Sequence, residues 1–329
     1  MTAQSPELDA TLSAEMAALL EQLARELGPV PDPTLLPPAE GRAMTEEGNR
    51  RWNTDLPPMA AVSEITIPAD PALSSAPCRI KVLVPPNAGS GAILFAHGGG
   101  FALCSPESHE RCARVLACDS GLPVLLPDYR LAPEHPFPAG LMDVIASLRA
   151  VQERPEDFGL TPGPLLVAGD SAGANLVLAA MLHEQEQGRP LPAGGLFFYG
   201  VFAADHDTPS HRFFAQGPGL TTAKMQRYWD WYLPDHAARD NVLASPLRAD
   251  DAALAGLPPL FLLAAGIDPL LSDTLSLSAR LETLGRKDPL TVVPGVIHGF
   301  LQMTHSLAAA RQSLAAAGEA ARQMRRATD

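Results

Sequence analysis

The pentapeptide GDSAG at positions 169–173 constrains the fold of this chain more than any other stretch of its sequence. It follows the apolar run 165–168 and precedes the helix-forming stretch 175–187. A serine on a sharp turn between a strand and a helix needs small neighbours, because a side chain at either glycine would collide inside the bend. The amino end of the next helix would direct free N–H groups and a positive dipole end at an oxyanion beside the serine. The sequence therefore predicts a strand–turn–helix unit that exposes Ser171 as a nucleophile.

A second glycine-rich turn lies upstream. The apolar run 92–96 leads into a histidine and three consecutive glycines at 97–100. Consecutive glycines after a strand let the backbone turn its N–H groups toward a ligand, which supplies the other half of an oxyanion hole. We therefore expect Gly98 and Gly99 to donate hydrogen bonds from one side and Ala172 from the other. The alternative is a flexible glycine loop, which is disfavoured because two motifs of one mechanism occur in the right order.

Short β-rich runs alternate with amphipathic helical runs from residue 63 onward. The expected strands lie at 63–69, 78–84, 92–96, 123–127, 165–169, 194–201, 259–265 and 290–294. The expected helices lie at 107–118, 139–152, 174–187, 273–286 and 308–326. This alternation predicts an α/β fold with an eight-stranded, mostly parallel sheet flanked by helices on both faces. Only a short link separates the first two strands, which should form an antiparallel hairpin.

Two segments depart from the alternation, namely residues 1–55 and residues 204–240. The first contains an amphipathic helix and a proline-rich link, and the second holds six of the 13 aromatic residues outside the expected strands. We expect both to form a helical cap over a catalytic core made of 56–203 and 241–329. The candidate substrate-pocket side chains are Phe101, Leu103, Phe213, Phe214, Trp229 and Tyr232. The alternative is that the aromatic residues only attach the insertion to the core.

A serine hydroxyl needs a base to take its proton, and the base needs a carboxylate to fix its tautomer. Asp268 and His298 each follow an apolar strand and come after Ser171 in the order that the elbow motif requires. Among nine histidines, His298 alone combines a position after a strand with a flanking glycine and this order. Asp273 competes with Asp268 but lies further from the strand end. We predict a catalytic triad of Ser171, Asp268 and His298.

Composition argues against several other classes of protein. The formal net charge of the 329-residue chain is −13, which disfavours nucleic acid as a partner. No apolar run approaches the roughly 18 to 20 residues of a membrane span, and residues 1–7 lack the basic start of a signal peptide. A cytoplasmic location is therefore predicted. The four cysteines form no C-x-x-C pair, so we expect free thiols and no metal site, with Cys104 nearest the glycine run.

Five motifs together resemble the hormone-sensitive lipase family of bacterial esterases, often called family IV. They are HGGG at 97–100, DYRLAPE at 128–134, GDSAG at 169–173, DPL at 268–270 and HGF at 298–300. The resemblance implies an α/β-hydrolase core with a helical cap, and a carboxylic ester hydrolase that prefers short acyl chains and needs no cofactor. It implies an acyl-enzyme intermediate on Ser171, with Asp268 and His298 in the triad. It also permits a homodimer formed through the last strand.

Two positions depart from the family pattern. Ala174 stands where a glycine is usual, and Cys104 stands where a glycine is common. Either change would narrow the acyl or alcohol pocket without affecting catalysis. Two other functions stay open. One is a small-molecule binding protein, as in plant hormone receptors that resemble this family but lack the catalytic histidine; the presence of His298 argues against it. The other keeps the triad but cleaves an amide or performs a specialised deacetylation.

Overall fold

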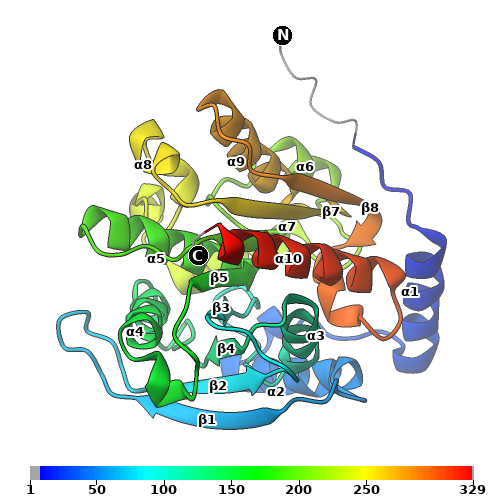
Figure 1. The fold of residues 1–329 in the computed structure, drawn as a ribbon. Coiled ribbons are helices and arrows are strands. Elements are labelled where there is room, and N and C mark those ends of the chain that lie inside the picture. The colour runs from blue at the N-terminus through cyan, green and yellow to red at the C-terminus, as the bar shows by residue number, and fades with distance from the viewer. Residues whose placement is uncertain (1–7, 328–329) are drawn as a thin grey trace.

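One twisted sheet runs through the middle of the protein, with helices on both of its faces (Figure 1). The computed structural model describes residues 8–327. The prediction about a signal peptide at residues 1–7 therefore lies outside the described residues. Within residues 8–327, no helix is both long enough and apolar enough to cross a bilayer.

The sheet has eight strands in the order β1-β2-β4-β3-β5-β6-β7-β8. They are β1 (Ala61–Ile67), β2 (Cys78–Val84), β3 (Ala92–Ala96), β4 (Val124–Pro127), β5 (Leu165–Asp170), β6 (Gly195–Phe198), β7 (Leu260–Ile267) and β8 (Leu290–Ile297). Strand β2 is antiparallel to β1 and to β4, and all other neighbours are parallel. The predicted α/β fold, with an eight-stranded, mostly parallel sheet, is confirmed.

Each central strand contributes to two separate hydrophobic cores, because successive side chains point to opposite faces of the sheet. In β3, Leu94 joins one core while Ile93 and Phe95 join the other. The first core is completed by α4 (Ala139–Glu153), α5 (Ala172–Glu186) and α9 (Leu271–Thr283), and the second by α1 (Ala14–Leu27), α3 (Glu110–Ser120) and α10 (Ala308–Arg326). Burial on both faces holds the carboxyl ends of β3, β5 and β7 in fixed relative positions, and β8 pairs with β7 at the edge of the sheet.

The segments that depart from the alternation form short helices around these strand ends. They are η1 (Pro33–Leu35), α2 (Pro38–Asn49), η2 (Arg50–Trp52), α6 (Pro209–Phe213), α7 (Thr222–Tyr232) and η4 (His236–Asp240). The remaining short helices are η3 (Pro155–Phe158), η5 (Pro246–Arg248), α8 (Asp251–Ala255) and η6 (Phe300–Met303).

The two segments predicted as a cap make direct contact. The guanidinium group of Arg227 on α7 donates to Thr34 Oγ1 at 2.6 Å and pairs with the Asp32 carboxylate. Helix α1 lies elsewhere, beside β8 and α10 (Figure 1), and Ser13 N donates to Gly295 O of β8 at 2.9 Å. Residues 33–52 thus neighbour α7, whereas α1 covers the edge of the sheet. The division into cap and core stays a prediction.

Candidate active site

The turn at Ser171 has the geometry that its glycine neighbours predict. Strand β5 ends at Asp170, α5 begins at Ala172, and Ser171 between them has φ 54° and ψ −119°. A positive φ is strained for a residue with a Cβ, and strain of this kind concentrates at functional sites. A Cβ on Gly173 would lie 2.0 Å from the carbonyl oxygen of Ala96, so β3 and α5 approach too closely for any other residue.

The structure brings together Ser171, His298 and Asp268, the three residues of the predicted triad. His298 Nε2 lies 2.9 Å from Ser171 Oγ, and His298 Nδ1 lies 2.7 Å from Asp268 Oδ2. Asp268 is fully buried, and its other oxygen accepts the backbone N–H of Leu270 at 2.8 Å. Because a carboxylate accepts hydrogen bonds only, the Nδ1 proton faces Asp268 and the Nε2 lone pair faces the serine hydroxyl. His298 is therefore oriented to remove the serine proton.

Asp273, the competing carboxylate, has different partners. Its Oδ2 accepts the backbone N–H groups of Phe202 at 2.7 Å and Ala203 at 3.1 Å. Burial raises the pKa of Asp273 to about 7 despite these two hydrogen bonds. Asp273 thus anchors the segment that follows β6, and Asp268 is the carboxylate that contacts His298.

The glycine loop requires a correction. The amide of Gly98 donates to Asp170 Oδ1 at 2.8 Å, so the prediction that Gly98 donates to an oxyanion is wrong. Gly99 and Gly100 line the same cavity as Ser171. Among residues 8–327, nothing accepts a hydrogen bond from the backbone N–H of Gly99, Gly100 or Ala172. These three amides are the candidate oxyanion-hole donors. The sequence does not show that Asp170 folds back and occupies the first amide.

The cavity at Ser171 has a volume of about 230 Å³. Besides Ser171, it is lined by Asn49, Trp52, Gly99, Gly100, Cys104, His109, Asp170, Leu220, Met225, Tyr228, His298, Gly299, Gln302 and Met303. Burial raises the pKa of the Cys104 thiol to about 12, which keeps it neutral as a wall of the cavity.

None of the six predicted pocket side chains lines this cavity. Phe101 stacks on Tyr232 with ring centroids 3.8 Å apart and lies 5.7 Å from the Trp229 ring, so these three form a buried aromatic cluster. Leu103 and Phe214 are buried elsewhere, and Phe213 is 53% exposed. The alternative, that the aromatic residues attach the insertion to the core, describes this cluster correctly.

Tyr228 of α7 and Trp52 are the aromatic residues that do line the cavity. Residues 229 and 232 are three apart and share one face of α7, while 228 lies on the neighbouring face. Helical periodicity, applied to the sequence, would have placed Tyr228 on a different face of α7 from Trp229 and Tyr232. Tyr228 lies so close to the glycine loop that a Cβ on Gly100 would be 2.3 Å from its ring.

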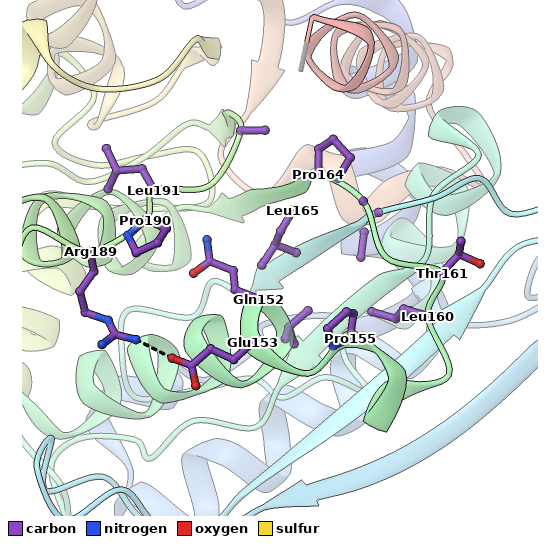
Figure 2. A pocket seen from close by; sticks show the side chains of 15 residues that line it. Gln152, Glu153, Pro155, Leu160, Thr161, Pro164, Leu165, Arg189, Pro190 and Leu191 are labelled. Atoms are coloured by element: carbon purple, nitrogen blue, oxygen red, sulfur yellow. Dashed lines mark hydrogen bonds and ion pairs between the residues drawn. The ribbon is translucent and has the colours of Figure 1, made fainter. Parts of the chain in front are cut away.

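A second cavity, of about 360 Å³, lies where β3 and β5 begin, at the opposite end of these strands from Ser171. Figure 2 shows its side chains, among which Arg189 pairs with Glu153 at 2.5 Å. Its lining residues include no serine, cysteine or histidine. This cavity is larger than the one at Ser171, but of the two only the smaller contains a serine hydrogen-bonded to a histidine. Over the part of the chain that the structure describes, no three His, Cys, Asp or Glu side chains are grouped to hold a metal ion.

Comparison with known proteins places this geometry among esterases. A family model for the alpha/beta hydrolase fold matches residues 93–302. Carboxylesterase NlhH of Mycobacterium tuberculosis is 32% identical over 286 residues, which cover 85% of this chain and 89% of the relative. The ester-hydrolase EH1AB1 from the metagenome of Lake Arreo, solved with a derivative of bipyridine phosphonate, is 32% identical with a TM-score of 0.88, covering 95% of this chain and 99% of that one.

A thermostable esterase from Pseudomonas putida ECU1011 is 29% identical with a TM-score of 0.86, covering 98% of this chain and 99% of that one. The match of the family model covers more than half of the chain and spans the glycine loop, the serine elbow and both triad partners. The chain therefore belongs to the alpha/beta hydrolase fold family, in the hormone-sensitive lipase-like group that its motifs resemble.

Proposed function

We propose that this protein hydrolyses carboxylic esters of short acyl chains through an acyl-enzyme intermediate on Ser171. The observation that carries the proposal is the continuous hydrogen-bond chain from Ser171 Oγ through His298 to Asp268. Ser171 and His298 line a cavity that is also lined by Gly99 and Gly100, whose backbone amides have no hydrogen-bond acceptor among the described residues. The esterases among its relatives support the same activity.

The reaction follows from the geometry. Ser171 Oγ attacks the ester carbonyl while His298 Nε2 takes its proton, and Asp268 stabilises the imidazolium that results. The carbonyl oxygen becomes an oxyanion and accepts hydrogen bonds from the amides of Gly99, Gly100 and Ala172. His298 then returns the proton to the departing alcohol. A water molecule attacks the acyl group by the same route and regenerates the serine.

The dimensions of the cavity support short acyl chains. Its volume of about 230 Å³ is enclosed by apolar side chains such as Trp52, Leu220, Met225 and Tyr228. The lower end of the volume range for ligand pockets is about 300 Å³, so this cavity suits small acyl groups.

Rates on matched acetyl esters and acetyl amides test whether the scissile bond is an ester.

The test is turnover of p-nitrophenyl acetate, butyrate and octanoate by the wild type and by Ser171→Ala. We expect the wild type to favour acetate or butyrate, and the variant to lose at least about a thousandfold in kcat because the nucleophile is absent. Circular dichroism and the melting temperature serve as controls for folding. Undiminished turnover in a folded Ser171→Ala protein would refute the proposed function.

A further inference from the structure

The side chain of Asp170 joins the serine elbow to the glycine loop. Asp170 Oδ1 accepts the Gly98 amide at 2.8 Å, and the Asp170 side chain is only 6% exposed. A Cβ on Gly98 would lie 2.6 Å from Asp170 Oδ2, so loop and carboxylate are in tight contact. The next two peptide groups carry the candidate oxyanion donors, and their carbonyl oxygens are held as well: Gly98 O accepts from His97 Nδ1 at 2.7 Å, and Gly99 O accepts the Leu103 amide at 2.9 Å. Asp170 therefore acts together with these contacts to set where the Gly99 and Gly100 amides point.

His109 holds Asp170 from the other side. His109 Nε2 lies 3.1 Å from Asp170 Oδ1, and the His109 side chain is only 4% exposed. A carboxylate offers no hydrogen, so Nε2 must carry the proton of this contact whether the ring is neutral or charged. Burial acts to raise the pKa of Asp170, but the charge of His109 and the hydrogen bonds from His109 and Gly98 lower it below its usual value. Asp170 is accordingly an anion whose Oδ1 is held by these two donors, while its Oδ2 accepts the Tyr199 hydroxyl at 3.5 Å.

The orientation of the His109 ring is fixed as well. His109 Nδ1 lies 2.9 Å from Ser108 Oγ, which in turn donates to Ser105 O at 2.8 Å and accepts from Ser105 N at 3.0 Å. The ring lies just before α3 and lines the cavity that contains Ser171 and His298. The triad does not use His109, and none of the five sequence motifs includes it.

We propose that His109 is a positioning residue for the oxyanion hole: it holds Asp170, which holds the Gly98 amide and so directs Gly99 and Gly100 at the developing oxyanion. This inference rests on the proposed ester hydrolysis. Oxyanion contacts strengthen in the transition state more than in the substrate complex. Loss of the His109 hydrogen should therefore lower kcat and leave KM nearly unchanged.

The test compares His109→Leu, which cannot donate, with His109→Gln, whose terminal amide can. Leu116→Val on the same helix is the control, because Leu116 is fully buried on α3 and its side chain has no polar atom that could hydrogen-bond to Asp170. With p-nitrophenyl butyrate we expect about a 10- to 100-fold lower kcat for His109→Leu, a KM within about twofold, and recovery of most of the loss in His109→Gln. Leu116→Val should match the wild type.

A transition-state analogue separates positioning from general damage. A trifluoromethyl ketone adds to Ser171 and places an oxyanion in the hole, whereas butyrate occupies the site without forming that adduct. We expect His109→Leu to weaken inhibition by the ketone by the same factor as kcat and to leave inhibition by butyrate unchanged. Wild-type kcat in His109→Leu, or unaltered inhibition by the ketone, would overturn the proposal.

Hydrogen exchange gives a readout that does not depend on turnover. The Gly98 amide should exchange faster in His109→Leu than in the wild type and in Leu116→Val, since its acceptor is no longer held. If His109→Leu does not fold, Ser108→Ala removes the contact on the other ring nitrogen and should give a smaller change in the same direction. Unchanged exchange across 97–104 refutes the positioning role, whereas a wild type without ester turnover refutes only the proposed function.

Discussion

Three buried carboxylates lie around the serine elbow, and their partners give them different properties. Asp268 contacts His298, Asp170 contacts His109, and Asp273 accepts two backbone amides. The pKa of Asp170 is lowered, although burial opposes it, and burial raises the pKa of Asp273 to about 7. An opposite charge or a donor favours the ionised form, and burial favours the neutral one. The choice of partner therefore decides which carboxylate can support an imidazolium.

The raised pKa of Asp273 predicts that folding stability depends on pH. Its pKa rises from 3.8 in the unfolded chain to about 7 in the folded one, so the folded state binds more protons between these values. The contribution of Asp273 to folding stability is fully present below pH 3.8 and is lost as the pH rises through about 7. Asp273→Asn keeps an acceptor for the Phe202 and Ala203 amides but cannot ionise. Its stability relative to the wild type should increase from pH 5 to pH 8.5, by at most about 3 kcal/mol.

Calorimetric melting temperatures of both proteins across this pH range test the prediction. Asp157→Asn is the control, since Asp157 lies in an exposed 3₁₀ turn. A difference between Asp273→Asn and the wild type that stays constant with pH would contradict the raised pKa of Asp273.

At the scale of elements, periodicity locates the strands but does not show how loops fold back. The predicted strands 78–84 and 92–96 coincide with β2 and β3, because burial on one or both faces dictates their composition. The serine, histidine and aspartate at strand ends could be identified because chain order and strand position constrain them. The sequence could not show which amides of the glycine loop are free, because Asp170 accepts the Gly98 amide only once the loop has folded.

The aromatic residues of the insertion show the same limit. Concentration of aromatic residues in 204–240 pointed correctly to a segment beside the site, since Tyr228 lines the cavity. Composition does not show which face of a helix contacts the core, and Trp229 and Tyr232 lie on the buried face of α7. Residues 33–52 gave no such signal, although Asn49 and Trp52 also line the cavity.

The contact between η1 and α7 predicts how the wall of the cavity formed by Tyr228 is held. Arg227 joins Thr34 and Asp32 and precedes Tyr228, whose ring lies against Gly100. Arg227→Met keeps the aliphatic stem but removes these hydrogen bonds. We expect faster amide exchange in 33–49 and 222–232, and a KM for p-nitrophenyl butyrate raised about 3- to 10-fold, because binding of substrate must then order both segments.

Arg212→Met provides the matched control for this prediction. Its ion pair with Asp207 lies in the same insertion, but both side chains are more than half exposed, so its loss should change neither exchange nor KM. Equal effects of the two substitutions would show that the contact between η1 and α7 does not hold this wall of the cavity.

At the scale of the whole molecule, the sheet ends in two edge strands, β1 and β8. An edge strand presents unpaired backbone groups that invite pairing with another chain. The end of β8 is protected, because Pro294 lacks an N–H group and Ser13 bonds to Gly295. The beginning of β8 is more exposed, and Val292 is 36% accessible. Within β8, the opening half is therefore the part available to a second copy.

We expect a homodimer that pairs β8 of one protomer with β8 of its partner, which would continue the sheet across both chains. Sedimentation should then give twice the 34.8 kDa chain mass for the wild type. Val292→Lys should give the chain mass itself, because a charge on an edge strand opposes pairing and the two lysines of a symmetric pair repel. Ester turnover should persist in the variant, since no β8 residue lines the cavity at Ser171. A wild type that sediments as a monomer at micromolar concentration would exclude this assembly, and a dimer that survives Val292→Lys would place the interface on another surface.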